Sequence, residues 1–383
     1  MRVIQLLPTL AYGDAVGNDV LALRDIISGW GYETGIWAEN IGPLMEDMAQ
    51  YFNTPPRLRQ DDVIIYHGSI GSDLTDKLSA MPGRKVLIYH NITPPHFFHE
   101  FNGEVEANCQ RGLDQMRGLA KDGVINYCIA DSAFNKSDLL EMGFTCPVEV
   151  CPILIPFQDY SRQPSPDRLK ELDDENVNVL FVGRGAPNKK QEDVIRAFHA
   201  YHTCFNPASR LILVGGWMED CLSRAKDDIL RLGLSNDILI TDHVSFEELL
   251  ACYQAADVFL CMSEHEGFCV PLVEAMYFNI PIVAYASSAV PDTLGSGGVL
   301  INKKEPLEAA WQIHRLVEDE DHWNHVVEEQ RRRLKDFSYE SVSATLEETL
   351  LRFIREGENS QPVQYSHVSA SAPKRRARHM VRH

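Results

Sequence analysis

The chain has 383 residues, of which 44% are hydrophobic and 24% are charged, so it is long enough for two globular domains with full cores. Its formal net charge of -19 argues against nucleic-acid binding, because an acidic body repels phosphate, and an acidic nucleotide would need locally placed cations. No apolar run approaches the ~18 residues of a membrane span, and the N-terminal stretch is too short and strand-like for a signal peptide, which predicts a cytoplasmic protein.

The first half of the chain alternates apolar runs with helical segments. This alternation predicts a doubly wound parallel sheet, whose ligands lie at the carboxyl ends of the strands. Polar groups stand at three such ends, namely His67, His90 and the pair Asp131 and Ser132. Ser132 is expected only to cap a helix that begins near Phe134. The predicted strands are 3–7, 63–66, 86–89 and 124–130, and the predicted helices include one ending near residue 27 and one at 105–120.

A turn with Gly13 and Asp14 follows the first strand. Gly13 and Gly17 are spaced wrongly for the Gly-x-Gly-x-x-Gly dinucleotide fingerprint. On their own, these residues indicate a glycine-bearing turn between a strand and a helix.

A polar, proline-bearing segment at 159–174 has the composition of a linker, and the apolar run at 177–183 starts a second sheet. Arg184 and Lys189 follow in a glycine-bearing turn, before a helix that ends near residue 204. A guanidinium can clamp a pyrophosphate by a forked contact, and an ammonium can do so as a point charge. Asn188 stands where a dinucleotide fingerprint needs its third glycine, which argues against a nicotinamide enzyme.

Two more predicted strands end in turns that could face a nucleotide. The strand 211–214 precedes Gly215, which has no side chain to keep a nucleotide from the backbone. The strand 238–240 precedes a loop with His243 and Val244, and a helix is predicted at 246–254. The sheet resumes at 281–285.

Nine cysteines are scattered along the chain. Their odd number and the absence of a Cys-x-x-Cys pair predict reduced thiols and argue against a zinc site. Cys128 and Cys261 lie inside apolar runs and are expected in the core.

The segment 257–276 combines the strongest chemical signals. An apolar strand at 257–262 is followed by a turn at Gly267 and a helix from Pro271 to about Phe278, because proline is tolerated at the first helical position. A helix N-terminus after a glycine turn binds anions through free N–H groups and the helix dipole. Glu266 and Glu274 flank this turn, and their carboxylates can accept hydrogen bonds from sugar hydroxyls.

This segment resembles the Glu-x7-Glu signature of retaining glycosyltransferases of family 4. The resemblance implies the GT-B fold, an α/β architecture with two Rossmann-like, doubly wound parallel-sheet domains facing a cleft. It assigns the donor's ribose to Glu274 and the transferred sugar or its phosphate to Glu266. Backbone amides of Gly267, Phe268, Cys269 and Val270 would then hold sugar hydroxyls and pyrophosphate.

Other positions acquire roles through the same resemblance. The family holds the donor phosphates with a Gly-Arg pair, here ending in Arg184, and with a lysine that could be Lys189 or, at the rarer spacing, Lys190. His90 matches a histidine that hydrogen-bonds the donor sugar, and the loop with Asn91 and Thr93 is expected to line the acceptor pocket. Donor contacts are also implied for a second group of residues: Gly13, Asp14, Gly215, His243 and Val244. Where the family usually has Gly-Gly, this chain has Gly13-Asp14, which puts the phosphate contact of this turn in doubt.

The C-terminal part carries two charged segments. Asp319, Glu320 and Asp321 resemble an Asp-x-Asp metal motif, but we interpret them as acidic charges at a helix N-terminus. Residues 358–383 are predicted to be a disordered tail whose basic residues could loosely contact an anionic membrane: Lys374, Arg375, Arg376, Arg378 and Arg382. The predicted division is an acceptor-side domain at 1–158, the linker 159–174, a nucleotide-sugar domain at 175–335 and a helix at 336–357 that crosses back.

The leading hypothesis is a retaining, metal-independent hexosyltransferase without a cofactor, in which a nucleoside-diphosphate sugar is a substrate. The donor would be GDP-mannose or a UDP-sugar, and the acceptor a saccharide or lipid-linked molecule in surface polysaccharide or glycolipid synthesis. Two alternatives stay open, a nucleotide-sugar epimerase on the same fold and a non-catalytic nucleotide-sugar-binding partner subunit. Base, sugar, acceptor, linkage and oligomeric state cannot be read from the residues.

Overall fold

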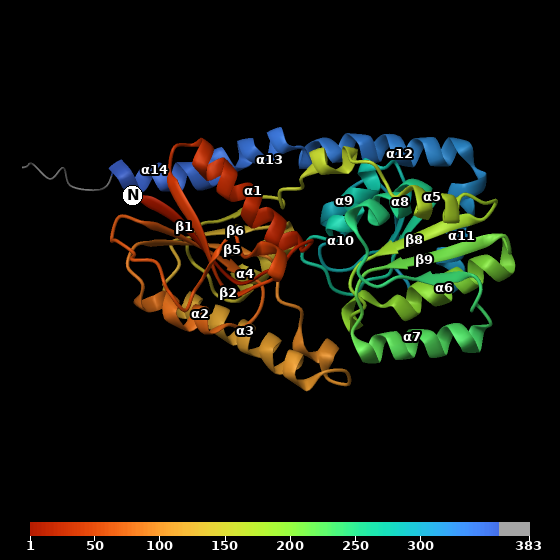
Figure 1. The fold of residues 1–383 in the computed structure, drawn as a ribbon, viewed down its shortest axis with the longest axis horizontal. Helices are drawn as coiled ribbons and strands as arrows, with labels where there is room; N and C mark the ends of the chain where they lie inside the picture. Colours follow the sequence, from red (N-terminus) through yellow and green to blue (C-terminus); the bar gives the residue numbers. More distant parts are fainter. Residues whose placement is uncertain (360–383) are drawn as a thin grey trace, which may run out of the picture.

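A computed structural model of the chain describes residues 1–359. These residues form two α/β domains, each built around one sheet in which all strand pairs are parallel (Figure 1). The two-domain, doubly wound architecture predicted from the sequence is therefore confirmed. The basic residues at 374–382 and most of the predicted tail lie outside the described residues.

The first domain contains a seven-stranded sheet with the order β3-β2-β1-β4-β5-β6-β7. Its strands are β1 (Arg2–Leu10), β2 (Glu33–Ile41), β3 (Gln50–Tyr51), β4 (Val63–Gly68), β5 (Arg84–Tyr89), β6 (Tyr127–Ala130) and β7 (Val148–Val150). Its helices are α1 (Ala15–Gly29), α2 (Asp73–Lys77), α3 (Gly103–Lys121) and α4 (Ala133–Glu141). Successive residues of β1 face opposite sides, so Val3 packs with α1 while Ile4 packs in the core beneath α3.

The second domain contains a six-stranded sheet with the order β10-β9-β8-β11-β12-β13. Its strands are β8 (Val177–Val182), β9 (Ser209–Val214), β10 (Ile238–Ile240), β11 (Val258–Cys261), β12 (Ile282–Tyr285) and β13 (Val299–Ile301). Its helices are α5 (Pro166–Leu172), α6 (Gln191–Cys204), α7 (Glu219–Leu232), α8 (Phe246–Ala255), α9 (Val270–Tyr277), α10 (Val290–Leu294), α11 (Pro306–Glu318) and α12 (Glu320–Leu334).

The C-terminal helices α13 (Tyr339–Leu346) and α14 (Arg352–Asn359) return to the first domain (Figure 1). A π-helical turn at Glu347–Leu351 joins them. Leu346, Leu350 and Ile354 are buried in the same apolar cluster as Val3 and Val63 of the first sheet. None of the described helices is long and apolar enough to cross a bilayer.

Several local predictions can be compared with the observed elements. Helix α6 ends at Cys204 as predicted, whereas the strand predicted at 124–130 begins only at Tyr127. The Asp319 carboxylate caps α12 and the Ser132 hydroxyl caps α4, which confirms both as helix-end groups. The segment predicted as a linker is ordered, because it contains α5 and the buried side chain of Tyr160.

All nine cysteines are free, as expected, and Cys128 and Cys261 are buried in the core. Strands β2, β3, β7 and β13 were not predicted. β2, β3 and β7 carry polar residues that interrupt an apolar run, and β13 has only three residues.

Candidate functional site

In the turn between β11 and α9, three successive backbone carbonyls are hydrogen-bonded to groups outside the turn. The carbonyl oxygens of Glu266, Gly267 and Phe268 accept hydrogen bonds from the Ala289 amide, the Ser132 hydroxyl and the Thr293 hydroxyl, respectively. Because C=O and N–H point in opposite directions across a trans peptide, the amides of the next three residues point away from these donors. The amides of Gly267, Phe268 and Cys269 therefore lie just before the N-terminus of α9, where the helix dipole favours an anion.

Helix α9 begins at Val270, one residue before the predicted start. Cys269 precedes it with a φ of 71°, in the left-handed region that is costly for a residue with a side chain. This strained residue redirects the chain sharply from the turn into the helix.

Lys189 and Glu266 form an ion pair beside this turn. The Lys189 ammonium donates to both Glu266 carboxylate oxygens at 2.7 Å, and the two side chains are 23% and 7% exposed. Burial has the largest single effect and lowers the pKa of the Lys189 ammonium, but the charge and hydrogen bond of Glu266, together with the Cys269 and Cys261 thiols, outweigh burial and raise this pKa. Lys190 instead pairs with Glu264 at 3.5 Å, so Lys189 is the lysine that reaches the turn.

Glu274 is buried in α9, and tyrosine hydroxyls hold both of its carboxylate oxygens. Tyr160 donates at 2.7 Å and Tyr253 at 2.5 Å. Burial raises the pKa of the Glu274 carboxyl, and the two hydrogen bonds oppose this rise. The sequence analysis missed both tyrosines, although the aromatic residues at 157 and 160 were an available sign that the supposed linker is packed.

The turns after β8, β9 and β10 lie against one another. A Cβ at Gly215 would lie 2.4 Å from the carbonyl oxygen of Gly183, and one at Gly216 would lie 2.5 Å from the His243 ring. Gly215 must be glycine because its neighbour is backbone, whereas the neighbour of Gly216 is the exposed side chain of His243. Val244 packs against the apolar core of the domain. Arg184 has an exposed side chain at the end of β8.

Arg184 also lies within electrostatic reach of the first domain. Desolvation raises the pKa of the Asp14 carboxyl, while the positive charges of His90 and Arg184 act against this rise. Asp14 precedes α1, and Gly13 before it has a φ of 73°, which a glycine accommodates without strain. The Gly13-Asp14 turn therefore lies on the side of the first domain that faces Arg184.

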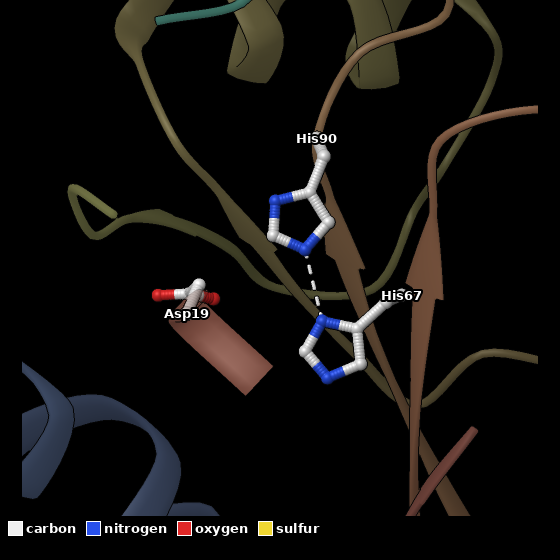
Figure 2. A group of neighbouring side chains, drawn as sticks. All are labelled: Asp19, His67 and His90. Carbon is white, nitrogen blue, oxygen red and sulfur yellow. Dashed lines mark hydrogen bonds between the residues drawn. The ribbon is translucent and has the colours of Figure 1, made fainter. Parts of the chain in front are cut away.

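His90 is held by two partners in the first domain. Its Nδ1 lies 2.8 Å from Asp131 Oδ2 and its Nε2 lies 2.9 Å from Nδ1 of His67 (Figure 2). Its side chain is only 1% exposed. Both ring nitrogens therefore already have protein partners, and a sugar hydroxyl would have to displace one of them. The sequence placed His67 and His90 at strand ends, but did not predict their contact.

Direct contacts join the two domains at this point. A Cβ on Gly267 would lie 2.5 Å from Asn91 Cβ and 3.0 Å from the His90 carbonyl oxygen. The Ser132 hydroxyl donates to the Gly267 carbonyl at 2.7 Å, and His265 Nε2 lies 2.6 Å from Asn91 Oδ1. Burial lowers the pKa of His265 to about 4, so this ring is neutral near pH 7.

We call this region the interdomain site, defined by His90, Asn91, Asp131, Lys189, Glu266 and Gly267. Thr93 lies two residues beyond Asn91 and is half-buried, with no hydrogen bond of its side chain among the described residues. Phe268 and Cys269 are buried on the second-domain side, and Val270 opens α9.

Two groups of described residues have donor atoms close enough together for a metal ion. One consists of Asp19, His67 and His90, and the other of Cys261, Glu266 and Cys269. In the first group every histidine nitrogen already has a protein partner, and in the second both Glu266 oxygens bind Lys189. A metal would have to displace these contacts, so neither group fits a metal better than its present partners.

We predict that Asp19→Asn increases stability in neutral solution. Burial raises the pKa of Asp19 to about 6, above the unfolded value of about 4, so the carboxylate destabilises the fold once it ionises above that pH. The expected gain in unfolding free energy is on the order of 3 kcal/mol at pH 8 and below about 1 kcal/mol at pH 4. Urea unfolding at both pH values measures it, with exposed Asp25→Asn as the control. An equal effect at both pH values would show that the charge is not responsible.

The second domain matches a known family model. Residues 165–339 match the model described as glycosyl transferases group 1. A segment of 168 residues is 27% identical to the O-antigen chain mannosyltransferase B of Escherichia coli, covering 43% of each chain. A segment of 141 residues is 32% identical to the GDP-mannose:cellobiosyl-diphosphopolyprenol alpha-mannosyltransferase of Xanthomonas oryzae pv. oryzae, covering 36% of this chain and 37% of the relative. The chain thus matches less than half the length of either relative.

Solved structures extend the likeness to both domains. The Anabaena protein HepE in complex with UDP and glucose superposes with a TM-score of 0.70 at 20% identity, covering 92% of this chain and all of that one. Sucrose-phosphate synthase from Thermosynechococcus elongatus superposes with a TM-score of 0.70 at 17% identity, covering 93% of this chain. The chain therefore has the GT-B fold, and residues 165–339 are similar to glycosyl transferases group 1.

Proposed function

We propose that the protein is a retaining, metal-independent glycosyltransferase that takes a hexose from a nucleoside-diphosphate sugar. The observation that carries this proposal is the pairing of Lys189 with Glu266 beside the backbone turn that leads into α9. Arg184, at the end of the neighbouring strand β8, would complete this group. A cation, a carboxylate and free amides in one place can bind a diphosphate and the hydroxyls of the attached sugar at the same time.

Donor binding would exchange partners within the site. Lys189 would leave Glu266 and bind the diphosphate, and Arg184 would bind the diphosphate as well. The freed Glu266 carboxylate would then accept hydrogen bonds from the transferred sugar. Glu274 would bind the ribose, because a carboxylate has about four acceptor positions and the two tyrosines use only two of them. His243 and Val244 would lie near the base.

The chemical step needs charge stabilisation more than proton transfer by the protein. The bond between the anomeric carbon and the diphosphate breaks while the acceptor oxygen bonds to that carbon from the same face. The acceptor's proton leaves with the departing phosphate. Lys189, Arg184 and the amide end of α9 would stabilise the negative charge that develops on the leaving group, which is the task a metal performs in other transferases.

The donor and acceptor are proposed from the relatives. Mannosyltransferases recur among them, and one is named for GDP-mannose and a diphosphopolyprenol-linked acceptor. We therefore propose GDP-mannose as the donor, ahead of a UDP-sugar. The proposed acceptor is a saccharide or a lipid-linked molecule, and the proposed role is surface polysaccharide or glycolipid synthesis. The basic residues at 374–382 would loosely contact the anionic membrane that presents such an acceptor.

The direct test is a donor and product assay. GDP should raise the melting temperature more than UDP or ADP, and GDP-mannose should yield an α-linked product by NMR of the anomeric proton. Excess EDTA should leave the rate unchanged, because protein cations hold the diphosphate. A β-linked product or complete loss of activity in EDTA would contradict the proposed mechanism, and formation of an epimer from donor alone would favour an epimerase.

Lys189→Ala is predicted to lower kcat/KM by about 100-fold or more, since it removes one preorganised charge from the leaving group. The matched control is Lys303→Ala. Lys303 lies on the same domain, its side chain is 75% exposed, and its ammonium lies as far as 4.0 Å from the Glu305 carboxylate. The control should retain the wild-type rate. Equal rates for Lys189→Ala and the wild type would remove Lys189 from the mechanism.

A further inference from the structure

A hydrogen-bonded chain leads from the core of the first domain to the interdomain site. The Gln5 amide nitrogen donates to the Val20 carbonyl at 3.1 Å, and Gln5 Oε1 lies 2.9 Å from His67 Nε2. His67 Nδ1 then lies 2.9 Å from His90 Nε2, and His90 Nδ1 lies 2.8 Å from Asp131. Gln5 and His67 are completely buried. The two imidazole rings face each other edge to edge along this chain (Figure 2).

The direction of the chain determines where the protons lie. Because Gln5 donates through its nitrogen to a backbone carbonyl, its oxygen must accept, so His67 Nε2 carries a proton. A neutral His67 then has an unprotonated Nδ1, which accepts a hydrogen bond from the N–H at His90 Nε2. The other nitrogen of His90 faces a carboxylate and also donates. His90 therefore carries two ring protons and a positive charge.

The electrostatic surroundings agree with this assignment. Burial disfavours a charged His90, but the charge and hydrogen bond of Asp131, with the charges of Asp19 and Asp14, outweigh burial and raise its pKa to about 9. His67 shows the opposite behaviour, since burial and the neighbouring His90 charge lower its pKa. Two further groups lie near these carboxylates: the Cys151 thiol, whose pKa is raised by burial and by the charges of Asp19 and Asp131, and the Arg184 guanidinium, whose positive charge acts on Asp14.

A metal ion would be the other way to join two imidazoles and a carboxylate. Metal-binding histidines also donate their outer nitrogen to an oxygen acceptor, as both do here. However, the inner nitrogens lie 2.9 Å apart, which is itself a hydrogen-bond distance, whereas Asp19 accepts from the Leu154 amide. A proton satisfies all four ring nitrogens without any movement.

We propose that Gln5 and His67 are positioning residues that hold His90 as a fixed imidazolium, and that its charge offsets the carboxylates behind the donor's diphosphate. The role of the His90 charge toward the donor rests on the proposed transferase function. Asp14, Asp19 and Asp131 would otherwise present an uncompensated negative charge to an anionic donor. His90 would thus act through its charge, because neither ring nitrogen is free to bind a sugar.

The first experiment requires no substrate. The 15N-labelled full-length protein is titrated from pH 5.5 to 10 and its histidine ring nitrogens are followed by NMR, with His67→Asn and His90→Asn used for assignment. At pH 7.5 His90 should have two protonated nitrogens, and His67 should be neutral with its proton on Nε2. A neutral His90 at this pH, or one equivalent of bound metal in the purified protein by mass spectrometry, would overturn the proposal.

Two substitutions at His67 separate its hydrogen bond from simple packing. His67→Asn keeps an oxygen acceptor near the position of Nδ1, whereas His67→Leu leaves the His90 proton without an acceptor. The leucine variant should lower the His90 pKa by about one unit or more, because the charged form loses a hydrogen bond. The asparagine variant should largely restore it. Equal His90 pKa values in both variants and the wild type would overturn the positioning role.

Kinetics connect the charge to the donor. In His67→Leu the KM for the donor should rise by about threefold or more at pH 8.5, because a His90 pKa lowered by about one unit leaves that much less of the protonated form, and it should approach the wild-type value at pH 6, where His90 regains its proton. The kcat should change less, and exposed His325→Leu should behave as the wild type. A KM defect of the same size at both pH values would indicate structural damage and overturn the charge role. The NMR titration does not depend on turnover. If the protein is not a transferase, the titration can therefore still show whether Gln5 and His67 hold His90 as an imidazolium.

Discussion

The close approach of the Gly267 backbone to the loop after β5 fixes how the two domains meet. Any side chain at position 267 would overlap Asn91, whose amide is already held by Asn135, Asp138 and His265. This contact places the turn with Glu266 next to the strand end with His90. It also brings Ser132, the neighbour of Asp131, onto the carbonyl that orients the turn. The arrangement of charged groups in the interdomain site follows from this one backbone contact.

Charges in the site are matched in pairs. Lys189 neutralises Glu266, and His90 neutralises Asp131, while the chain as a whole carries a net charge of -19. A buried charge without a partner is costly, so each pair keeps the site stable until an anionic ligand offers a better partner. We infer that this balance lets an acidic protein bind an acidic nucleotide sugar, because the carboxylates of these pairs are already neutralised by Lys189 and His90.

Local sequence patterns predicted the fold, and they suggested which residue types belong to the candidate site. The apolar runs at β1, β4, β5, β8 and β11 identified both sheets, and the Gly267 turn with its helix identified the region around Glu266. Lys189 and Lys190 could not be distinguished from spacing alone. The left-handed backbone at Lys190 directs that side chain to Glu264 and leaves Lys189 for Glu266.

The pairings that hold these residues could not be predicted, because they join distant parts of the chain. Asn91 and His265 are separated by 174 residues, and Tyr160 and Glu274 by 114. Tyr160 was hidden in a segment whose average composition is that of a linker. The protonation of His90 depends on the orientation of the Gln5 amide, which only the folded backbone of α1 determines.

The central claim is that the interdomain site binds the diphosphate of the donor. The most direct test is calorimetric titration of GDP and of guanosine into the wild type and into Arg184→Ala. If the protein binds UDP more tightly than GDP, UDP and uridine replace them. The account predicts that GDP affinity falls by about tenfold or more in the variant, while guanosine affinity stays the same. Equal GDP affinity for both proteins would contradict it.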